Sequence, residues 1–120
     1  MSRVLIVDDD VSIAQMVVAV LADEGIAARA VTHASDLDAA MSGQRPELVL
    51  LDVNMPGARG GDGLAWLRRG GPLAGIPAVV MTGDPDALVG QDASKLGIAA
   101  CLLKPFEIED LVAIVSKLLS

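Results

Sequence analysis

Aromatic residues are almost absent from this chain, since Trp66 and Phe106 are the only two in 120 residues. Val, Leu, Ile and Ala must therefore build the core. A single cysteine, Cys101, excludes an internal disulfide and fits a reducing cytoplasm. No apolar run reaches the ~20 residues that a membrane-spanning helix needs, and the N-terminus lacks the pattern of a signal peptide. We therefore expect a cytoplasmic protein with no membrane contact.

Basic residues are also scarce. The net charge is −7, and Arg68-Arg69 is the only basic cluster. Contacts with nucleic acid phosphates need clustered lysines and arginines, so we expect no nucleic acid binding by this chain alone. Apolar residues make up 52% of the sequence, which excludes a disordered chain. The length suits a single domain, residues 1–120, with no effector domain in this chain.

Short apolar runs alternate with stretches of helical period along the whole chain. Strands that are buried on both faces read as continuous apolar runs, and such runs lie near 3–7, 27–31, 47–51, 77–82 and 99–103. Helical stretches follow them near 11–24, 35–42, 63–69, 86–96 and 107–119. This alternation predicts an α/β fold, a doubly wound five-stranded parallel sheet.

The first predicted helix is apolar on two stripes. We expect Asp10 to cap its start and Gly25 to end it. The stronger stripe should face the core, and the weaker one is left over as a candidate docking surface for a partner. The core stripe is Ile13, Met16, Val17, Val20 and Leu21, and the weaker stripe is Val11, Ala14 and Val18. The last helix should turn Ile108, Leu111, Val112 and Val115 inward, with Ile114 and Leu118 off that face.

Polar residues stand at the end of four of the apolar runs. Asp8 and Asp9 follow the first run, Asp52 follows the third, Thr82 follows the fourth and Lys104 follows the fifth. The carboxyl ends of parallel strands share one edge of a sheet, and ligand sites in open α/β sheets lie along that edge. We therefore expect three carboxylates, a hydroxyl and an ammonium group to meet in one cleft.

This set of groups suits the formation of an acyl phosphate. The reaction needs a nucleophilic carboxylate, a cation that neutralises the phosphoryl oxygens, and further donors. Asp52 is the central carboxylate, and Asp8 and Asp9 would help it hold Mg²⁺, which prefers oxygen ligands. Without a metal, repulsion among the carboxylates should raise one pKa. Each residue alone also fits a helix cap, a turn or a solvated surface, but four such positions in register favour a site.

Four motifs occupy these strand ends: Val7-Asp8-Asp9, Leu51-Asp52 followed by Met55-Pro56-Gly57, Met81-Thr82-Gly83, and Leu103-Lys104-Pro105-Phe106. Together they resemble the receiver domain of bacterial two-component response regulators, including its single-domain chemotaxis form. The likeness runs from Arg3 to the last helix. It implies a flavodoxin-like sheet of order 2-1-3-4-5 with five helices, and a phosphoacceptor that switches conformation to control a partner or an output domain.

The resemblance also implies a role for each site residue. Asp52 would accept a phosphoryl group from the phosphohistidine of a sensor histidine kinase or a phosphotransfer protein. Asp9 would bind Mg²⁺ directly, Asp8 would act mainly through metal-bound water, and the backbone carbonyl of Asn54 would complete the ligands. Thr82 and Lys104 would bind the phosphoryl oxygens. Such a domain catalyses its own phosphorylation and dephosphorylation and is not a conventional enzyme.

Three features depart from the family pattern. Residues 57–63 form an expanded glycine-rich loop that includes Arg59. Cys101 stands where the family typically has an aromatic residue that moves during switching, and we interpret it as a small buried core residue. The chain ends at Ser120, directly after the last helix, so it is either a stand-alone receiver or a piece of a larger protein. His33 is expected to be an ordinary surface residue.

Two other kinds of protein, a phosphohydrolase and a flavin-binding module, use a similar arrangement of strands and helices. A phosphohydrolase of the haloacid-dehalogenase type needs a second acid two residues after the nucleophile, and that position is Asn54. A flavodoxin-type module needs a phosphate-binding loop after the first strand, where three aspartates would repel phosphate. A degenerate receiver that only mediates protein contacts is the third alternative, and the intact polar set argues against it.

Two backbone features are expected near the site. Lys104 and Pro105 should be joined by a cis peptide bond, because the chain must turn sharply there and the cis form of an X–Pro bond costs only about 0.5–1 kcal/mol. The resemblance to receiver domains also implies it. Phosphorylation should draw the loop of residues 82–86 toward Asp52 and shift the helix near 86–96, which contains Gly90.

Overall fold

The structure is a computed structural model that describes residues 3–33, 45–52, 75–83 and 97–119. The helices expected near 35–42, 63–69 and 86–96 lie outside these residues. So do Asn54, the loop 57–63 with Arg59, and the proposed switch segment that contains Gly90.

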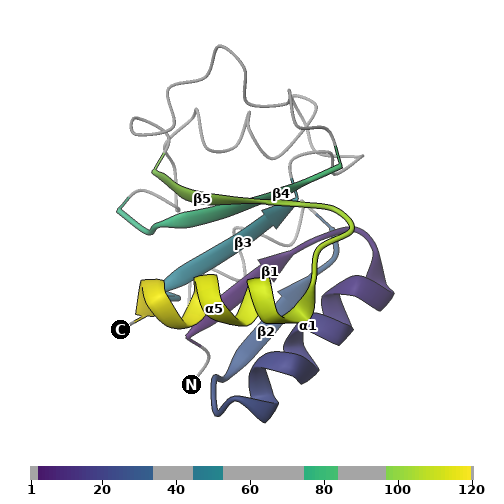
Figure 1. Cartoon of the computed structure of the whole chain (residues 1–120), viewed down its shortest axis with the longest axis horizontal. Helices are drawn as coiled ribbons and strands as arrows, with labels where there is room; N and C mark the ends of the chain where they lie inside the picture. Colours follow the sequence, from purple (N-terminus) through teal and green to yellow (C-terminus); the bar gives the residue numbers. More distant parts are fainter. Residues whose placement is uncertain (1–2, 34–44, 53–74, 84–96, 120) are drawn as a thin grey trace.

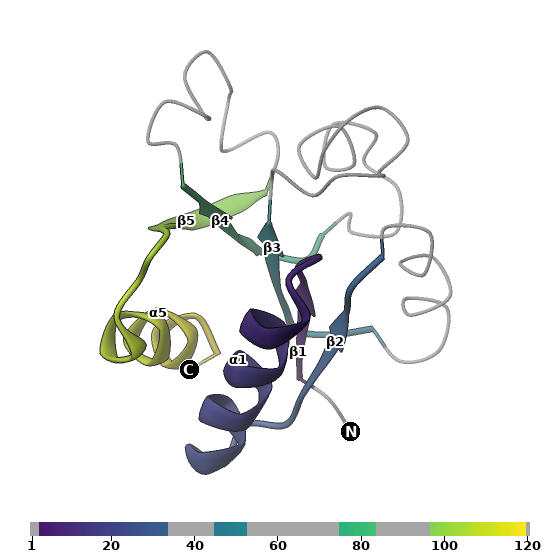
Figure 2. The same cartoon turned by 90° about the vertical axis from the view of Figure 1, so that its right-hand side faces the viewer.

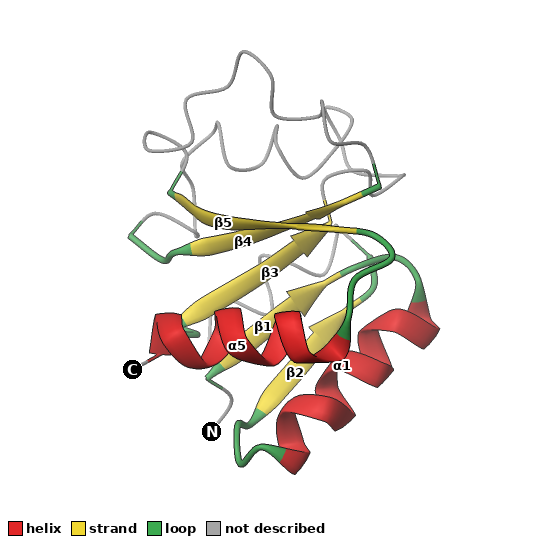
Figure 3. Ribbon diagram, viewed as in Figure 1, coloured by secondary structure: helices red, strands yellow, loops and turns green. Residues whose placement is uncertain are grey.

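Five parallel strands form one sheet in the order β2-β1-β3-β4-β5, as the sequence predicts (Figures 1 and 3). The strands are β1 (Val4–Val7), β2 (Ala28–Val31), β3 (Leu48–Asp52), β4 (Ala78–Thr82) and β5 (Ile98–Leu103). Each bound falls within one residue of the predicted one, which is the usual uncertainty of an element's end.

The three central strands are completely buried, and the two edge strands are only partly so. This difference explains why the central strands are unbroken apolar runs, since both of their faces are removed from water. In register, Val7 pairs with Leu51, the next residue Asp52 pairs with Met81, and Thr82 pairs with Leu103. The strands therefore end at nearly the same level, and their last residues meet at one edge.

Helix α1 (Val11–Asp23) begins and ends where the sequence predicts. The Asp10 side chain accepts a hydrogen bond from the Ile13 backbone N–H at 3.1 Å, which satisfies one of the free donors of the first turn. Gly25 follows the helix at a φ of 77°, a left-handed conformation that glycine adopts without strain. Asp10 therefore sets where α1 begins after β1, and Gly25 sets where the chain leaves α1 and turns toward β2.

The predicted core face of α1 is partly wrong. Val17 and Leu21 are buried and Val11 is 52% exposed, as predicted. Ala14 is buried although it was placed on the weaker stripe, and Met16 is 38% exposed although it was placed on the core stripe. Val18 packs against the core, so it does not belong to a leftover surface stripe. The helix is apolar almost all round, and its contacts with β1, β2 and α5 decide which stripe is buried.

Helix α5 (Ile108–Leu119) lies beside α1 on the same face of the sheet (Figure 2). Leu111 and Val115 are buried as predicted, but Ile108 is 47% exposed. Ile114 and Leu118, which were expected to lie off the core face, pack against the core. The inward face is thus rotated from the predicted one, because α5 also has to meet α1.

Two further predictions, the peptide bond before Pro105 and the exposure of His33, agree with the structure. The peptide bond between Lys104 and Pro105 is cis. His33 is exposed, and its Nδ1 lies 3.2 Å from the Thr32 hydroxyl. Within the described ranges, we find no helix that is both long enough and apolar enough to cross a membrane.

Candidate functional site at the carboxyl edge of the sheet

The sheet brings together the five site residues that the structure describes. Asp8 and Asp9 come directly after β1, Asp52 and Thr82 are the last residues of β3 and β4, and Lys104 comes directly after β5. The Lys104 backbone N–H donates to the Thr82 carbonyl at 2.7 Å, which continues the pairing of β4 and β5 past their ends. The aligned strand ends therefore bring distant parts of the sequence to one place.

The three carboxylates form a compact cluster. Each offers one ligand oxygen, and these atoms all lie within 4.8 Å of one another. Asp8 is fully buried and Asp52 is 5% exposed, whereas Asp9 is open to solvent. The oxygens around an octahedral Mg²⁺ lie about 3–4 Å apart. The cluster therefore fits a small hard cation after slight adjustment, with Asp9 on its open side.

Lys104 joins two of these carboxylates. Its Nζ donates to Asp8 Oδ2 at 2.8 Å and to Asp52 Oδ2 at 3.4 Å. Burial by itself lowers the pKa of Lys104, but the hydrogen bond with Asp8 and the charges of both carboxylates outweigh it and raise the pKa. The ammonium group is therefore firmly charged, and it balances part of the negative charge of the cluster.

Both oxygens of Asp8 have donors within the protein. Oδ1 accepts from the Asp10 backbone N–H at 2.9 Å, and Oδ2 accepts from Lys104. Burial raises the pKa of Asp8, the two hydrogen bonds oppose that rise, and the charge of Asp52 adds a smaller upward push. A raised pKa in the metal-free cluster was predicted, but burial contributes more to it than repulsion between the carboxylates.

Thr82 is buried, with 1% of its surface exposed. It stands between β3 and β5 in the strand order, beside the ends that carry Asp52 and Lys104. The position predicted from its place after an apolar run is therefore observed. Asn54, the fourth proposed ligand, lies outside the described residues.

Cys101 differs from its prediction. It is exposed, because β5 is an edge strand of the sheet and the outward-facing positions of its alternating pattern remain open. Partial burial nevertheless raises the pKa of its thiol. A raised pKa keeps the less reactive thiol form at neutral pH, so the thiol is not tuned as a nucleophile.

The sequence did not reveal the partners of Asp8. A lysine 96 positions away and the N–H of a residue two positions away hold its carboxylate. The Asp8-Asp9-Asp10 run does contain a signal for the second contact, because aspartates often accept hydrogen bonds from the backbone two residues on. The contact with Lys104 depends on the fold.

Known proteins resemble this chain over most of its length. The family model described as "Response regulator receiver domain" matches residues 4–116. The DNA-binding response regulator MtrA of Mycolicibacterium smegmatis is 36% identical over 111 residues, which are 92% of this chain and 47% of MtrA. The chain therefore spans about half the length of the MtrA relatives that it matches.

Solved structures agree on the fold. The receiver domain of NtrX from Brucella abortus superposes with a TM-score of 0.83 and 32% identity, and the match covers 97% of each chain. The chemotaxis response regulator CheY4 of Vibrio cholerae superposes with a TM-score of 0.82 and 27% identity, covering 98% of each chain. The fold of this chain is therefore shared with these solved structures.

Proposed function

This chain belongs to the response regulator receiver domains of two-component systems, and on that premise we propose that it is a phosphoacceptor whose acceptor group is the Asp52 carboxylate. The observation that carries the proposal is the cluster of Asp8, Asp9 and Asp52, with Lys104 bridging two of its members. By this proposal the chain catalyses its own phosphorylation and dephosphorylation and has no separate substrate that it turns over.

Asp52 is the member of the cluster best suited to attack phosphorus. Its neighbour Asp8 has both oxygens engaged by protein donors, and Asp9 is open to solvent on the outer side. The longer 3.4 Å contact of Asp52 with Lys104 is the weaker of the two lysine contacts and the easier one to give up. In the transfer, an Asp52 oxygen forms a bond to phosphorus, the phosphorus–nitrogen bond of phosphohistidine breaks, and the nitrogen keeps the electron pair.

Lys104 and Thr82 are proposed to hold the new phosphoryl group. The ammonium of Lys104 already lies against the Asp52 carboxylate, so it can meet an added phosphoryl oxygen with a small movement. Thr82 offers a hydroxyl from the adjacent strand end. Charge-assisted hydrogen bonds of this kind are the strong ones in proteins, and their formation is the proposed trigger of the conformational switch.

Mg²⁺ is the proposed cofactor, held by Asp9 and Asp52 directly, by Asp8 through water, and by the backbone carbonyl of Asn54. When bound, it neutralises the phosphoryl oxygens during transfer. An outer role for Asp8 is supported by the engagement of both its oxygens. Asp9 is supported as a direct ligand because its carboxylate is accessible and within reach of the other two.

The proposed phosphodonor is a sensor histidine kinase or a phosphotransfer protein that docks on α1. Ala14 is fully buried, so it cannot belong to the docking stripe that the sequence predicted. Val11 and Met16 are the large apolar residues of α1 that are exposed, and Val11 lies directly after the Asp8-Asp9-Asp10 run. We expect Met16→Glu to lower transfer from the kinase while leaving phosphorylation by a small donor intact.

The output is proposed to be a downstream protein or an effector domain. MtrA is named a DNA-binding response regulator and is about twice the length of the part matched here. Few basic residues are present in this chain, whose net charge is −7. We therefore propose that any contact with nucleic acid belongs to another polypeptide or domain, which this receiver controls.

The test is incubation of the chain with Mg²⁺ and acetyl phosphate, followed by intact mass measurement. We expect a gain of one phosphoryl group in the wild type and no gain in Asp52→Asn. Asp23→Asn, which neutralises an exposed aspartate at the end of α1, is the matched control and should gain the group normally. A full gain in Asp52→Asn would place the nucleophile elsewhere, and no gain in the wild type would refute the phosphoacceptor.

A further inference from the structure

Arg3 connects three elements at the amino edge of the sheet, opposite the carboxylate cluster. Its backbone N–H donates to the Ala27 carbonyl at 2.8 Å, and its carbonyl accepts from the Glu47 N–H at 2.7 Å. Its side chain donates from Nε to Glu47 Oε2 at 2.7 Å and from Nη2 to the Leu119 carbonyl at 3.4 Å. The starts of β1 and β3 and the end of α5 therefore meet at one residue (Figure 1).

Glu47 holds the Arg3 guanidinium in one orientation. Besides the 2.7 Å contact of Nε, Nη2 lies 3.5 Å from Glu47 Oε1, so both oxygens of the carboxylate face the guanidinium. The hydrogen bond with Glu47 raises the pKa of Arg3, and the same bond lowers the pKa of Glu47, so both groups are charged at neutral pH. A two-pronged contact of this kind fixes the plane of a guanidinium, and here that plane also directs Nη2 at the end of α5.

The end of α5 has no glycine to close it. The last four carbonyls of a helix have no partner within the helix, and α1 meets this need with Gly25, whose N–H donates to the Ala22 carbonyl at 3.0 Å. No glycine occurs between residues 107 and 120. At α5 a donor comes instead from another element, since Arg3 reaches the Leu119 carbonyl. A cation at this position also suits the negative end of the helix.

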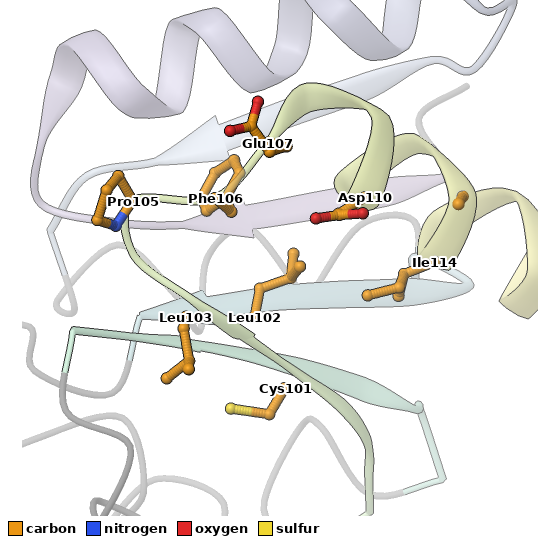
Figure 4. A pocket seen from close by; sticks show the side chains of 9 residues that line it. Cys101, Leu102, Leu103, Pro105, Phe106, Glu107, Asp110 and Ile114 are labelled. Atoms are coloured by element: carbon orange, nitrogen blue, oxygen red, sulfur yellow. The ribbon is translucent and has the colours of Figure 1, made fainter.

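The earlier turns of α5 are anchored by packing. Leu111 and Val115 are fully buried, and Ile114 packs against the core and lines the hollow between β5 and α5 (Figure 4). In the last turn, residues 116–119, two residues are exposed and two are only partly buried. Less packing therefore holds this turn, and it can open while the buried residues keep the rest of the helix in place.

We propose that Arg3 and Glu47 form a latch that keeps the last turn of α5 closed, and that this turn opens separately from the rest of the chain when the latch is released. Arg3 supplies the donor, and Glu47 is a positioning residue for it. Both side chains are partly open to water, so dissolved ions screen their attraction and the latch loosens as the salt concentration rises. Any segment joined to the end of α5 would take its direction from the state of this turn. The latch lies at the opposite edge from Asp52 and does not depend on phosphorylation there.

Hydrogen exchange of backbone amides, followed by NMR, measures the opening of this turn. In Arg3→Met, which keeps a long apolar stem, the amides of residues 116–119 should exchange about threefold faster or more, the scale of an exposed charged contact. Glu47→Gln should change the rates in the same direction, because the guanidinium loses its orientation. Arg3→Lys keeps the charge but lacks the fork that meets Glu47 and Leu119 together, so it should not restore slow exchange. Added salt should speed the exchange of these amides in the wild type and change it little in Arg3→Met.

Two control variants separate the latch from other causes of faster exchange. Val79→Ala leaves a cavity beside a fully buried strand residue, so it should speed the exchange of the sheet amides and leave residues 116–119 unchanged. Lys117→Gln removes a positive charge from the same turn and leaves both latch residues in place, so its effect should be smaller than that of Arg3→Met.

Several outcomes would overturn the proposal. Unchanged exchange of residues 116–119 in Arg3→Met would refute the latch. Slow exchange restored by Arg3→Lys, or equal acceleration by Lys117→Gln, would mean that any positive charge near the end of the helix suffices. Acceleration of residues 116–119 by Val79→Ala, to the extent seen in the sheet, would show that the turn opens only with the whole chain.

Discussion

Replacing Lys104 by methionine tests whether this one ammonium group stabilises the fold by balancing the negative charge of the carboxylate cluster. Methionine keeps much of the length of the lysine stem and removes only the charge and its hydrogen bonds. In the variant, the fully buried Asp8 would lose its 2.8 Å partner, and Asp52 would lose its 3.4 Å contact. The metal-free cluster would then contain three carboxylates with no lysine bridging them.

The expected loss of stability follows from the burial of the two partners. Removing one member of a completely buried ion pair costs about 3–5 kcal/mol, and a single hydrogen bond to a charged group contributes about 1.5–3 kcal/mol. The Lys104 side chain is 21% exposed, and Asp8 keeps its hydrogen bond from Asp10. We therefore expect the free energy of unfolding to fall by about 2 kcal/mol, a value within the lower of these two ranges.

Urea unfolding in the presence of EDTA measures this loss, with Lys117→Met as the control at an exposed position of α5. The control should change stability by less than about 0.5 kcal/mol. Saturating Mg²⁺ should restore part of the loss in Lys104→Met, because a divalent cation replaces the missing charge. The variant should also bind Mg²⁺ at least about fivefold more tightly, since a repelling charge near the site has gone.

The stability difference between the wild type and Lys104→Met should decrease as the pH falls. Burial raises the pKa of Asp8, so its carboxylate takes up a proton earlier than an exposed aspartate as the pH falls. A neutral Asp8 needs no ammonium partner, so the stability difference between wild type and Lys104→Met should be full near neutral pH and shrink in acid. A loss equal to that of Lys117→Met, or a loss that stays constant through the acid range, would refute the compensation argument.

Three further predictions concern single residues. Asp9→Ala should weaken Mg²⁺ binding by about tenfold or more, because it removes an accessible carboxylate from a site with few protein ligands; an unchanged Mg²⁺ titration would remove Asp9 from the ligands. Asp10→Ala should lower the free energy of unfolding by about 1 kcal/mol through loss of the α1 cap, and an unaltered urea midpoint would contradict this. Cys101 should react with iodoacetamide more slowly than free cysteine at neutral pH, because burial raises the pKa of its thiol. Its reaction should accelerate only above the pH range in which ordinary thiols ionise. Intact mass measured against time follows the reaction, and a faster reaction than that of free cysteine would show that the thiol is activated.

The positions of the strands and of the site residues were predictable because both depend on local sequence. An apolar run such as Leu48–Leu51 predicts a strand buried on both faces, whatever its neighbours are. Parallel strands joined by helices must also end at a common edge. Asp52 and Thr82 could therefore be placed together from their position after such runs, and the structure brings their strand ends side by side.

The buried side of each helix could not be predicted in the same way. Helix α1 carries apolar residues at 11, 13, 14 and 16–22, so its pattern permits more than one inward face. Packing against β1, β2 and α5 buried Ala14 and exposed Met16. The same competition turned Ile108 outward and Ile114 inward in α5, since a helix that meets both a sheet and a second helix buries the side that touches both.

The sequence by itself therefore determined which groups reach the carboxyl edge, and the tertiary structure decided what each group contacts there. Lys104 pairs with Asp8 because β5 and β1 end at the same level on either side of β3 and β4, a relation between residues 96 positions apart. Cys101 is exposed because its strand is the last of the sheet. Strand formation depends on neighbours along the chain, whereas burial and ion pairing depend on neighbours in space, and only the folded chain brings those together.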